Sequence, residues 1–257
     1  MERATYVALD LETTGLTPER DQIIEVGVVK FAGQRVLDTF SSFVNPNQSI
    51  PFQVTQLTGI HDKDVTQAPT IDLLLPTISQ FIGDSIILGH NVGFDRAFLA
   101  SAGLRLRNRS IDTFELANIV FPHATRYSLT ALANDLGVTL TSAHRALDDA
   151  NATRQVFLVL CERAKELPLP LLEKINRVSQ GTHWSLAGLL QGVQLPETQV
   201  VGASFEDRRL EFKGQGFLQV GYVLLEKLIL QVDGIGGDHH ALAFGCGKVC
   251  GGYQIGQ

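Results

Sequence analysis

The sequence predicts an α/β fold in which a five-stranded mixed sheet is flanked by helices. Three strand-like segments come first, and a turn short enough for a hairpin separates the second from the third. After them, segments with helical spacing alternate with two further short apolar runs. A hairpin followed by this alternation is typical of a mixed sheet that carries helices on its faces.

The five expected strands are rich in apolar and β-branched residues, or are short apolar runs bounded by turn signals. They are Ala4–Leu11, Gln22–Phe31, Arg35–Val44, Ser85–Gly89 and Ser110–Thr113. Between the second and the third lies the segment Ala32–Gln34, which contains Gly33. A turn of this length favours an antiparallel pairing of the two strands that it joins.

The expected helices are the segments in which apolar residues recur three or four positions apart. They are Gln53–Leu57, Ile71–Ile82, Gly93–Ala102, Phe114–Phe121, Ser128–Leu136 and Ala146–Leu167. Glycines follow three of them, at positions 59, 103 and 137. Glycine often ends a helix because it adopts a left-handed conformation without a steric cost.

The composition changes near Leu167, where Pro168 and Pro170 mark a boundary and beyond which most of the 24 glycines lie. We therefore expect one domain over residues 1–167 and a linker-like, glycine-rich extension of uncertain fold over residues 168–257. All three expected motifs of the site lie before this boundary. A chain that ends near Leu167 is accordingly expected to stay folded and active.

The overall composition, 44% hydrophobic and 19% charged, is that of a globular protein with a substantial core. There is no apolar run long enough to span a bilayer and no signal peptide, so we expect no membrane association. Three cysteines are too few for a disulfide framework, which favours a reducing, cytoplasmic location. The net charge of −6 argues mildly against tight, non-specific binding of nucleic acid.

Two acidic residues, Asp10 and Glu12, stand at the end of the first expected strand. Residues two apart on a strand project from the same face, so their carboxylates repel each other. A divalent cation would reverse that repulsion, and hard oxygen ligands suit Mg²⁺ or Mn²⁺. An isolated pair of this kind is nevertheless more common as strand-end acids that face solvent.

Three more candidates come later in the chain. Asp95 falls in the first turn of a helix, where the helix dipole stabilises an anion, so it is equally consistent with a simple helix-start acid. His144 and Asp149 are five positions, or about 500° of helix, apart and therefore converge more easily if His144 precedes the helix. An imidazole can accept a proton from water near neutral pH. Together, four carboxylates and a histidine indicate two-metal hydrolysis of a phosphodiester.

The order and context of these motifs resemble those of the DEDDh exonucleases. These form the DnaQ-like group that includes the exonuclease domain of the epsilon subunit of bacterial DNA polymerase III. The matching stretches are Asp10–Gly15, His90–Asp95 and His144–Asp149, and Leu57–Ile60 resembles a short helix that lies beside the terminal nucleotide in the family. The resemblance covers roughly residues 4–166. It implies a ribonuclease H-like fold.

The resemblance also implies a role for each site residue. Two divalent metal ions, Mg²⁺ or Mn²⁺, would be held by Asp10, Glu12, Asp95 and Asp149, with His144 as the base. Asp148 is set aside because the family spacing places the carboxylate five residues after the histidine. The 3′-terminal nucleotide would be lined by Thr13, Thr14, Gly15, Leu57, His90, Asn91 and Phe94. Phe94 is equally consistent with a core position. Three arginines could contact phosphate, but a solvated surface position is the stronger expectation for each of them: Arg96, Arg145 and Arg154.

The function implied is a 3′→5′ exonuclease that releases nucleoside monophosphates from single-stranded or frayed 3′ ends of DNA in proofreading or repair. An RNA-trimming exoribonuclease of the same fold remains open, because selectivity depends on contacts such as those to the 2′-OH. So does a non-catalytic module that binds nucleic acid or a polymerase, although such a module has no need of four clustered acids.

A DNA polymerase or a helicase is the expected protein partner. The segment Leu169–Arg177 resembles linkers that join such exonuclease domains to DinG-type helicases. The chain has no GxxxxGK[ST] motif, so we expect no helicase motor within it.

Overall fold

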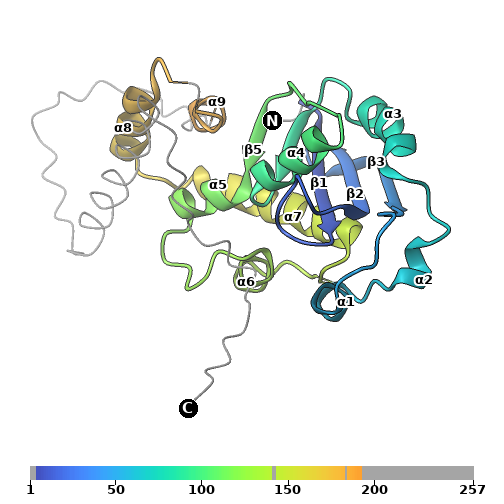
Figure 1. The fold of residues 1–257 in the computed structure, drawn as a ribbon. Coiled ribbons are helices and arrows are strands. Elements are labelled where there is room, and N and C mark those ends of the chain that lie inside the picture. The colour runs from blue at the N-terminus through green and yellow to red at the C-terminus, as the bar shows by residue number, and fades with distance from the viewer. Residues whose placement is uncertain (1–3, 141–142, 183, 193–257) are drawn as a thin grey trace, which may run out of the picture. The chain divides into compact units, whose positions relative to one another are not determined.

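The computed structural model describes residues 4–140, 143–182 and 184–192 (Figure 1). All of them belong to the first of the two units into which the chain divides, Met1–Ser204. Among the described helices, none is both long enough and apolar enough to cross a membrane.

The described strands form one sheet of the expected mixed kind, in the order β3-β2-β1-β4-β5. Their bounds are β1 Tyr6–Thr13, β2 Ile23–Ala32, β3 Arg35–Phe43, β4 Ile86–Gly89 and β5 Ser110–Asp112. β2 pairs antiparallel with both β1 and β3, whereas β4 pairs parallel with β1 and β5. The predicted α/β fold with a five-stranded mixed sheet is therefore confirmed.

The helices of the described residues lie close to their predicted positions. They are α1 Phe52–Thr58, α2 Asp62–Val65, α3 Ile71–Ile82, α4 Val92–Ser101, α5 Thr113–Val120, α6 Leu129–Asp135, α7 Ala146–Ala164, α8 Leu169–Ser179 and α9 Ala187–Gln191. Gly59 ends α1 in a left-handed conformation, with φ 71°, as predicted. Helices α2, α8 and α9 were not predicted from the sequence.

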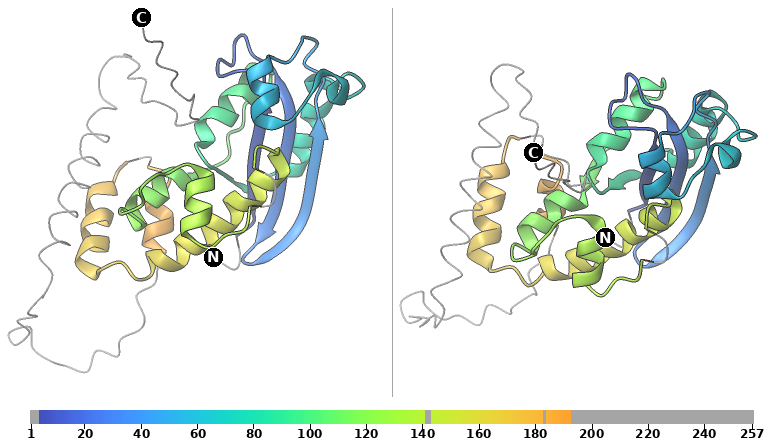
Figure 2. Two further views of the ribbon diagram at one scale, coloured as in Figure 1. Left: turned by 90° about the horizontal axis from the view of Figure 1, so that it is seen from below. Right: turned by 60° about the horizontal axis from the view of Figure 1, so that its bottom comes forward.

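Helices cover the sheet on two faces (Figure 2). β1 contributes side chains to a core on each face. Tyr6 and Ala8 belong to a first core with residues of α5 and α7, whereas Val7 and Leu9 belong to a second core with residues of α3 and α4. This alternation follows from the two-residue repeat of a strand. Position 10 and position 12 continue the row of Tyr6 and Ala8, and therefore face the side of α7.

The first core continues beyond Leu167, the expected end of the domain. It includes Ile175 of α8 together with Leu186, Leu189 and Leu190 in and beside α9. These two short helices therefore add buried apolar side chains to the core under α7. The glycine-rich end of the chain, from residue 193 onward, lies outside the described residues.

Candidate active site

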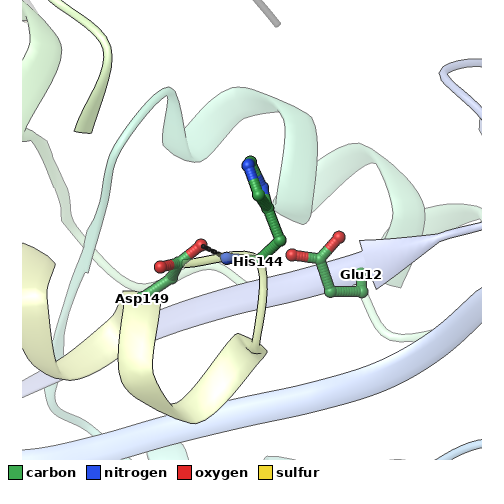
Figure 3. A group of neighbouring side chains, drawn as sticks. All are labelled: Glu12, His144 and Asp149. Atoms are coloured by element: carbon green, nitrogen blue, oxygen red, sulfur yellow. Dashed lines mark hydrogen bonds between the residues drawn. The ribbon is translucent and has the colours of Figure 1, made fainter. Parts of the chain in front are cut away.

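Glu12, His144 and Asp149 converge at the end of β1 (Figure 3). Glu12 belongs to β1, His144 to the turn before α7, and Asp149 to the first turn of α7. One ligand atom from each residue lies within 4.8 Å of the others. The carboxylate side chains are buried, since Glu12 is 2% exposed and Asp149 is 8% exposed. Two buried acids this close indicate a site suited to a positive charge.

The turn before α7 explains how residues five apart come together. His144 has a left-handed backbone, with φ 65°, and Arg145 is the last residue before the helix. The backbone N–H of His144 donates to Oδ2 of Asp149 at 3.1 Å. The chain thus folds back over the first helical turn, which confirms that His144 precedes the helix. Asp149 lies in the first turn of α7.

Asp95 binds the backbone at the same end of β1, although it does not belong to the group formed by Glu12, His144 and Asp149. It is 4% exposed in the first turn of α4, and its Oδ1 accepts a hydrogen bond from the backbone N–H of Leu11 at 3.0 Å. Leu11 is the residue between Asp10 and Glu12. Asp10 is partly exposed and shares the α7-facing row of β1 with Glu12. The metal-ligand roles of Asp10 and Asp95 stay predictions.

The turn that carries the second motif is fixed by Asp112, a residue that the sequence analysis missed. Asn91 has a left-handed backbone, with φ 67°. The backbone N–H groups of Asn91 and Val92 donate to the two carboxylate oxygens of Asp112, at 2.9 and 3.0 Å. Asp112 also accepts from the N–H of Phe114 and so caps α5. The sequence offered one signal for this role of Asp112: an aspartate directly before a helix commonly caps the N-terminus of that helix.

His90 engages both ring nitrogens within the protein. Nε2 lies 2.7 Å from the carbonyl of Tyr127, and Nδ1 lies 2.9 Å from Oγ1 of Thr113. Burial lowers the pKa of His90, although the nearby charge of Asp112 acts in the opposite direction. The carbonyl of Tyr127 can only accept, so Nε2 is the donor in that contact, whereas the hydroxyl of Thr113 lies near both Nδ1 and the carbonyl of Gly89, at 3.2 Å from the latter.

The first motif ends in a tightly closed loop. Oγ1 of Thr13 donates to the carbonyl of Gly15 at 2.6 Å. The hydroxyl oxygen of Thr14 accepts from the backbone N–H of Gln22 at 2.9 Å and lies 3.0 Å from Nε2 of Gln48. At Gly15 a Cβ atom would meet the carboxylate of Asp21 at 2.4 Å. The shape of this loop therefore depends on the side chains of the motif itself.

The two apolar residues expected to line the substrate differ in exposure. Leu57 is 43% exposed on α1, whereas Phe94 is partly buried against the second core, with its ring 4.8 Å from that of Phe98. A core contact of Phe94 is therefore present, and contact of either residue with a nucleotide stays a prediction.

The three arginines considered for phosphate contact each donate to groups within the protein, and all three are only partly buried. Arg96 donates to the carbonyls of Leu106 and Asn108. Arg145 donates to Glu25 on β2, and Arg154 donates to Asn151. A solvated role for them stays a prediction, and the side chain of Arg145 is 43% exposed.

The donor set fits a hard divalent cation. Glu12 and Asp149 supply carboxylate oxygens, which Mg²⁺ and Mn²⁺ prefer, and an imidazole nitrogen of His144 lies in the same group. Burial of both acids side by side is unfavourable unless a positive charge compensates them. The residues present can therefore hold a metal ion at this position.

The chain is similar to known exonucleases and to DNA polymerases. A family model described as an exonuclease, RNase_T, matches residues 7–157. A PolC-type DNA polymerase III of Clostridium perfringens (strain 13 / Type A) is 39% identical over 165 residues, which are 63% of this chain and 11% of the relative. The 3′-5′ exonuclease DinG of Bacillus subtilis (strain 168) is 35% identical over 186 residues, 70% of this chain and 20% of that protein. The chain thus matches only a small part of these relatives.

A solved structure supports the fold. Exonuclease X in complex with 5′ overhanging duplex DNA matches with a TM-score of 0.53 at 25% identity, over 61% of this chain and 91% of that chain. The expected ribonuclease H-like architecture is therefore confirmed. The chain belongs to the RNase_T family of exonucleases and carries a DnaQ-like, DEDDh-type 3′→5′ exonuclease domain.

Proposed function

We propose that the chain is a two-metal-ion exonuclease that hydrolyses the phosphodiester at the 3′ end of DNA and releases nucleoside monophosphates. The observation that carries the proposal is the convergence of Glu12, His144 and Asp149 within 4.8 Å. A module that only binds nucleic acid gains nothing from burying two carboxylates side by side. A hydrolase gains a place for the cations that phosphodiester cleavage requires.

Glu12 and Asp149 would hold one metal ion, and Asp10 and Asp95 would complete a second position at the end of β1. When bound, Mg²⁺ or Mn²⁺ would lower the pKa of water and stabilise the negative charge that develops on the phosphate oxygens. The protein contributes the rigid placement of these acids. Asp95 is tied to the backbone of Leu11, and Asp149 is tied to the backbone of His144.

His144 would act as the general base. Its side chain is partly exposed and its ring stands beside the two carboxylates, which are both buried (Figure 3). An imidazole nitrogen in this position can take the proton from the attacking water, a contribution typically worth ~10²–10⁴ in rate. His90, by contrast, directs both ring nitrogens to partners inside the protein and is not available for proton transfer.

The substrate that we propose is a single-stranded or frayed 3′ end of DNA, in proofreading or repair. The relatives named for a DNA polymerase III and for a 3′-5′ exonuclease support this choice. The first of these names makes a DNA polymerase the protein partner to test, and the resemblance of Leu169–Arg177 to linkers of DinG-type helicases makes a helicase the second. The compartment that we propose is the cytoplasm. The side chain of Leu57, half exposed on α1, would contact the terminal nucleotide.

Two oligonucleotides of one sequence, a DNA and an RNA labelled at the 5′ end, test both polarity and substrate. We expect the DNA to shorten one nucleotide at a time from the 3′ end and the RNA to be cut more slowly. Faster cutting of the RNA would favour the exoribonuclease alternative. Binding of either strand without any shortening in the presence of Mg²⁺ or Mn²⁺ would favour a non-catalytic module.

A further inference from the structure

Glu25 is a buried acid that the site described above does not use. It lies on β2 directly opposite Glu12 of β1 and is 2% exposed. Residues opposite each other in an antiparallel pair project from the same face, so Glu25 faces α7 as Glu12 does. It nevertheless does not belong to the group that could hold a metal ion.

The carboxylate of Glu25 accepts hydrogen bonds from the two residues at the start of α7. Arg145 donates to it from Nη2 at 2.8 Å and from Nε at 3.2 Å, and the backbone N–H of Ala146 donates to Oε2 at 3.0 Å. A carboxylate that receives a guanidinium fork and a helix N–H is held in one orientation. The two donor residues lie between His144 and Asp149 in the chain.

The backbone of α7 rests directly on β2 beside this contact. At Gly27 a Cβ atom would lie 2.1 Å from the carbonyl carbon of Ala146 and 2.2 Å from the nitrogen of Leu147. Gly27 is also the residue opposite Asp10 in the strand pair. The guanidinium of Arg145 lies 5.2 Å from the centre of the Phe43 ring, and Phe43 is the partner of Glu25 on β3. The first turn of α7 is thus fixed by residues of both β2 and β3.

We infer that Glu25 is a positioning residue of the active site, which, through Arg145 and Ala146, holds the start of α7 where His144 and Asp149 meet Glu12. This inference rests on the proposed function for its effect on rate. Its structural part does not depend on catalysis. Glu25 lies outside the group of residues that could hold a metal ion, and its carboxylate binds Arg145 and the backbone N–H of Ala146 instead.

The variants that test the inference are Glu25→Gln and Arg145→Lys. The first keeps an oxygen that can accept from Ala146 but removes the charge. The second keeps the charge but loses the planar fork, and it changes a half-exposed side chain. The matched control is Glu162→Gln, which breaks the exposed pair between Glu162 and Lys165, 2.7 Å long, at the other end of the same helix.

We expect both test variants to stay folded, with kcat lowered by roughly 10- to 100-fold and KM nearly unchanged, because misplacement of catalytic groups by about 1 Å can cost that much. The control should keep the native kcat. In a His144→Ala background, Glu25→Gln should lower kcat by a smaller factor than in the native protein, because only the displacement of Asp149 then still counts and residues that act through one another are not additive. A full additional loss in that background would overturn the claim that Glu25 positions His144. If Glu25→Gln does not fold, the same cycle is made with Arg145→Lys.

Amide hydrogen exchange gives a second readout that needs no catalysis. The N–H groups of His144 and Ala146 should exchange faster in the test variants than in the native protein and the control. Unchanged exchange together with native kcat in Arg145→Lys would refute the positioning role. If the native protein cuts neither DNA nor RNA, the proposed function fails, and the exchange comparison alone then decides whether Glu25 holds the start of α7.

Discussion

Replacement of Gly27 by alanine should damage the site although Gly27 lies on β2, outside the group of Glu12, His144 and Asp149. The added Cβ atom would lie 2.1 Å from the carbonyl carbon of Ala146, whereas ordinary contacts begin near 3.4 Å. The obstructing atoms are backbone, so no side chain can rotate out of the way. The first turn of α7 must retreat from β2 by about 1.3 Å, the difference between these two distances.

The retreat would carry His144 and Asp149 away from Glu12. A displacement of about 1 Å at a catalytic group can cost ~10² in rate, and overpacking of this kind typically costs ~1–3 kcal/mol of stability. We therefore expect kcat for release of nucleotide to fall by about two orders of magnitude and the melting temperature to fall by several degrees.

Gly188→Ala is the matched control, because the atom that its Cβ meets, Nη2 of Arg109 at 2.9 Å, is the end of a flexible side chain. This variant should keep the native kcat. A folded Gly27→Ala protein with native kcat would refute the claim that the close approach of α7 to β2 sets the site.

The remaining predictions concern single residues and the end of the domain. Asp149→Ala should lose nearly all activity while Asp148→Ala keeps most of it, in the same nucleotide-release assay; the reverse result would contradict the assignment of the third motif. His144→Ala should lower kcat by ~10²–10⁴ with little change in metal binding measured by calorimetry, and a native rate would remove it from the mechanism. Burial lowers the pKa of His90, so the folded protein favours the neutral ring. The contribution of His90 to the free energy of unfolding is therefore fully present above the ordinary pKa of about 6.5 and is lost as the pH falls below it. Melting temperatures measured against pH should show this loss, and they should depend less on pH in His90→Gln. A chain that ends at Leu167 should stay active but melt at a lower temperature, because it loses the apolar side chains of α8 and α9; an unchanged melting temperature would show that these helices add nothing to the core.

Local patterns predicted most of the fold because they follow from the geometry of single elements. Alternation along β1 placed Asp10 and Glu12 on one face, and the spacing of His144 and Asp149 indicated a turn before a helix. The left-handed end of α1 at Gly59 was equally local. These features need no knowledge of which segments meet in space.

Contacts between distant segments could not be predicted in this way. Arg145 pairs with Glu25, which lies 120 residues earlier. The residues around Arg145 in the sequence therefore gave no sign of this partner. Asp112 holds the turn at Asn91 across 21 residues for the same reason. The predicted end of the domain at Leu167 depended on prolines and glycines, whereas the first core draws on side chains as far as Leu190.

Release of mononucleotide from a 3′-labelled DNA strand, measured with Mg²⁺ and then with excess EDTA, tests the central claim most directly. We predict release with Mg²⁺, its complete loss with EDTA, and its return when Mn²⁺ or Mg²⁺ is added in excess of the chelator. Release that persists in EDTA would contradict the metal-dependent mechanism. Absence of release under all three conditions, from a folded protein, would contradict the assignment of exonuclease activity to this chain.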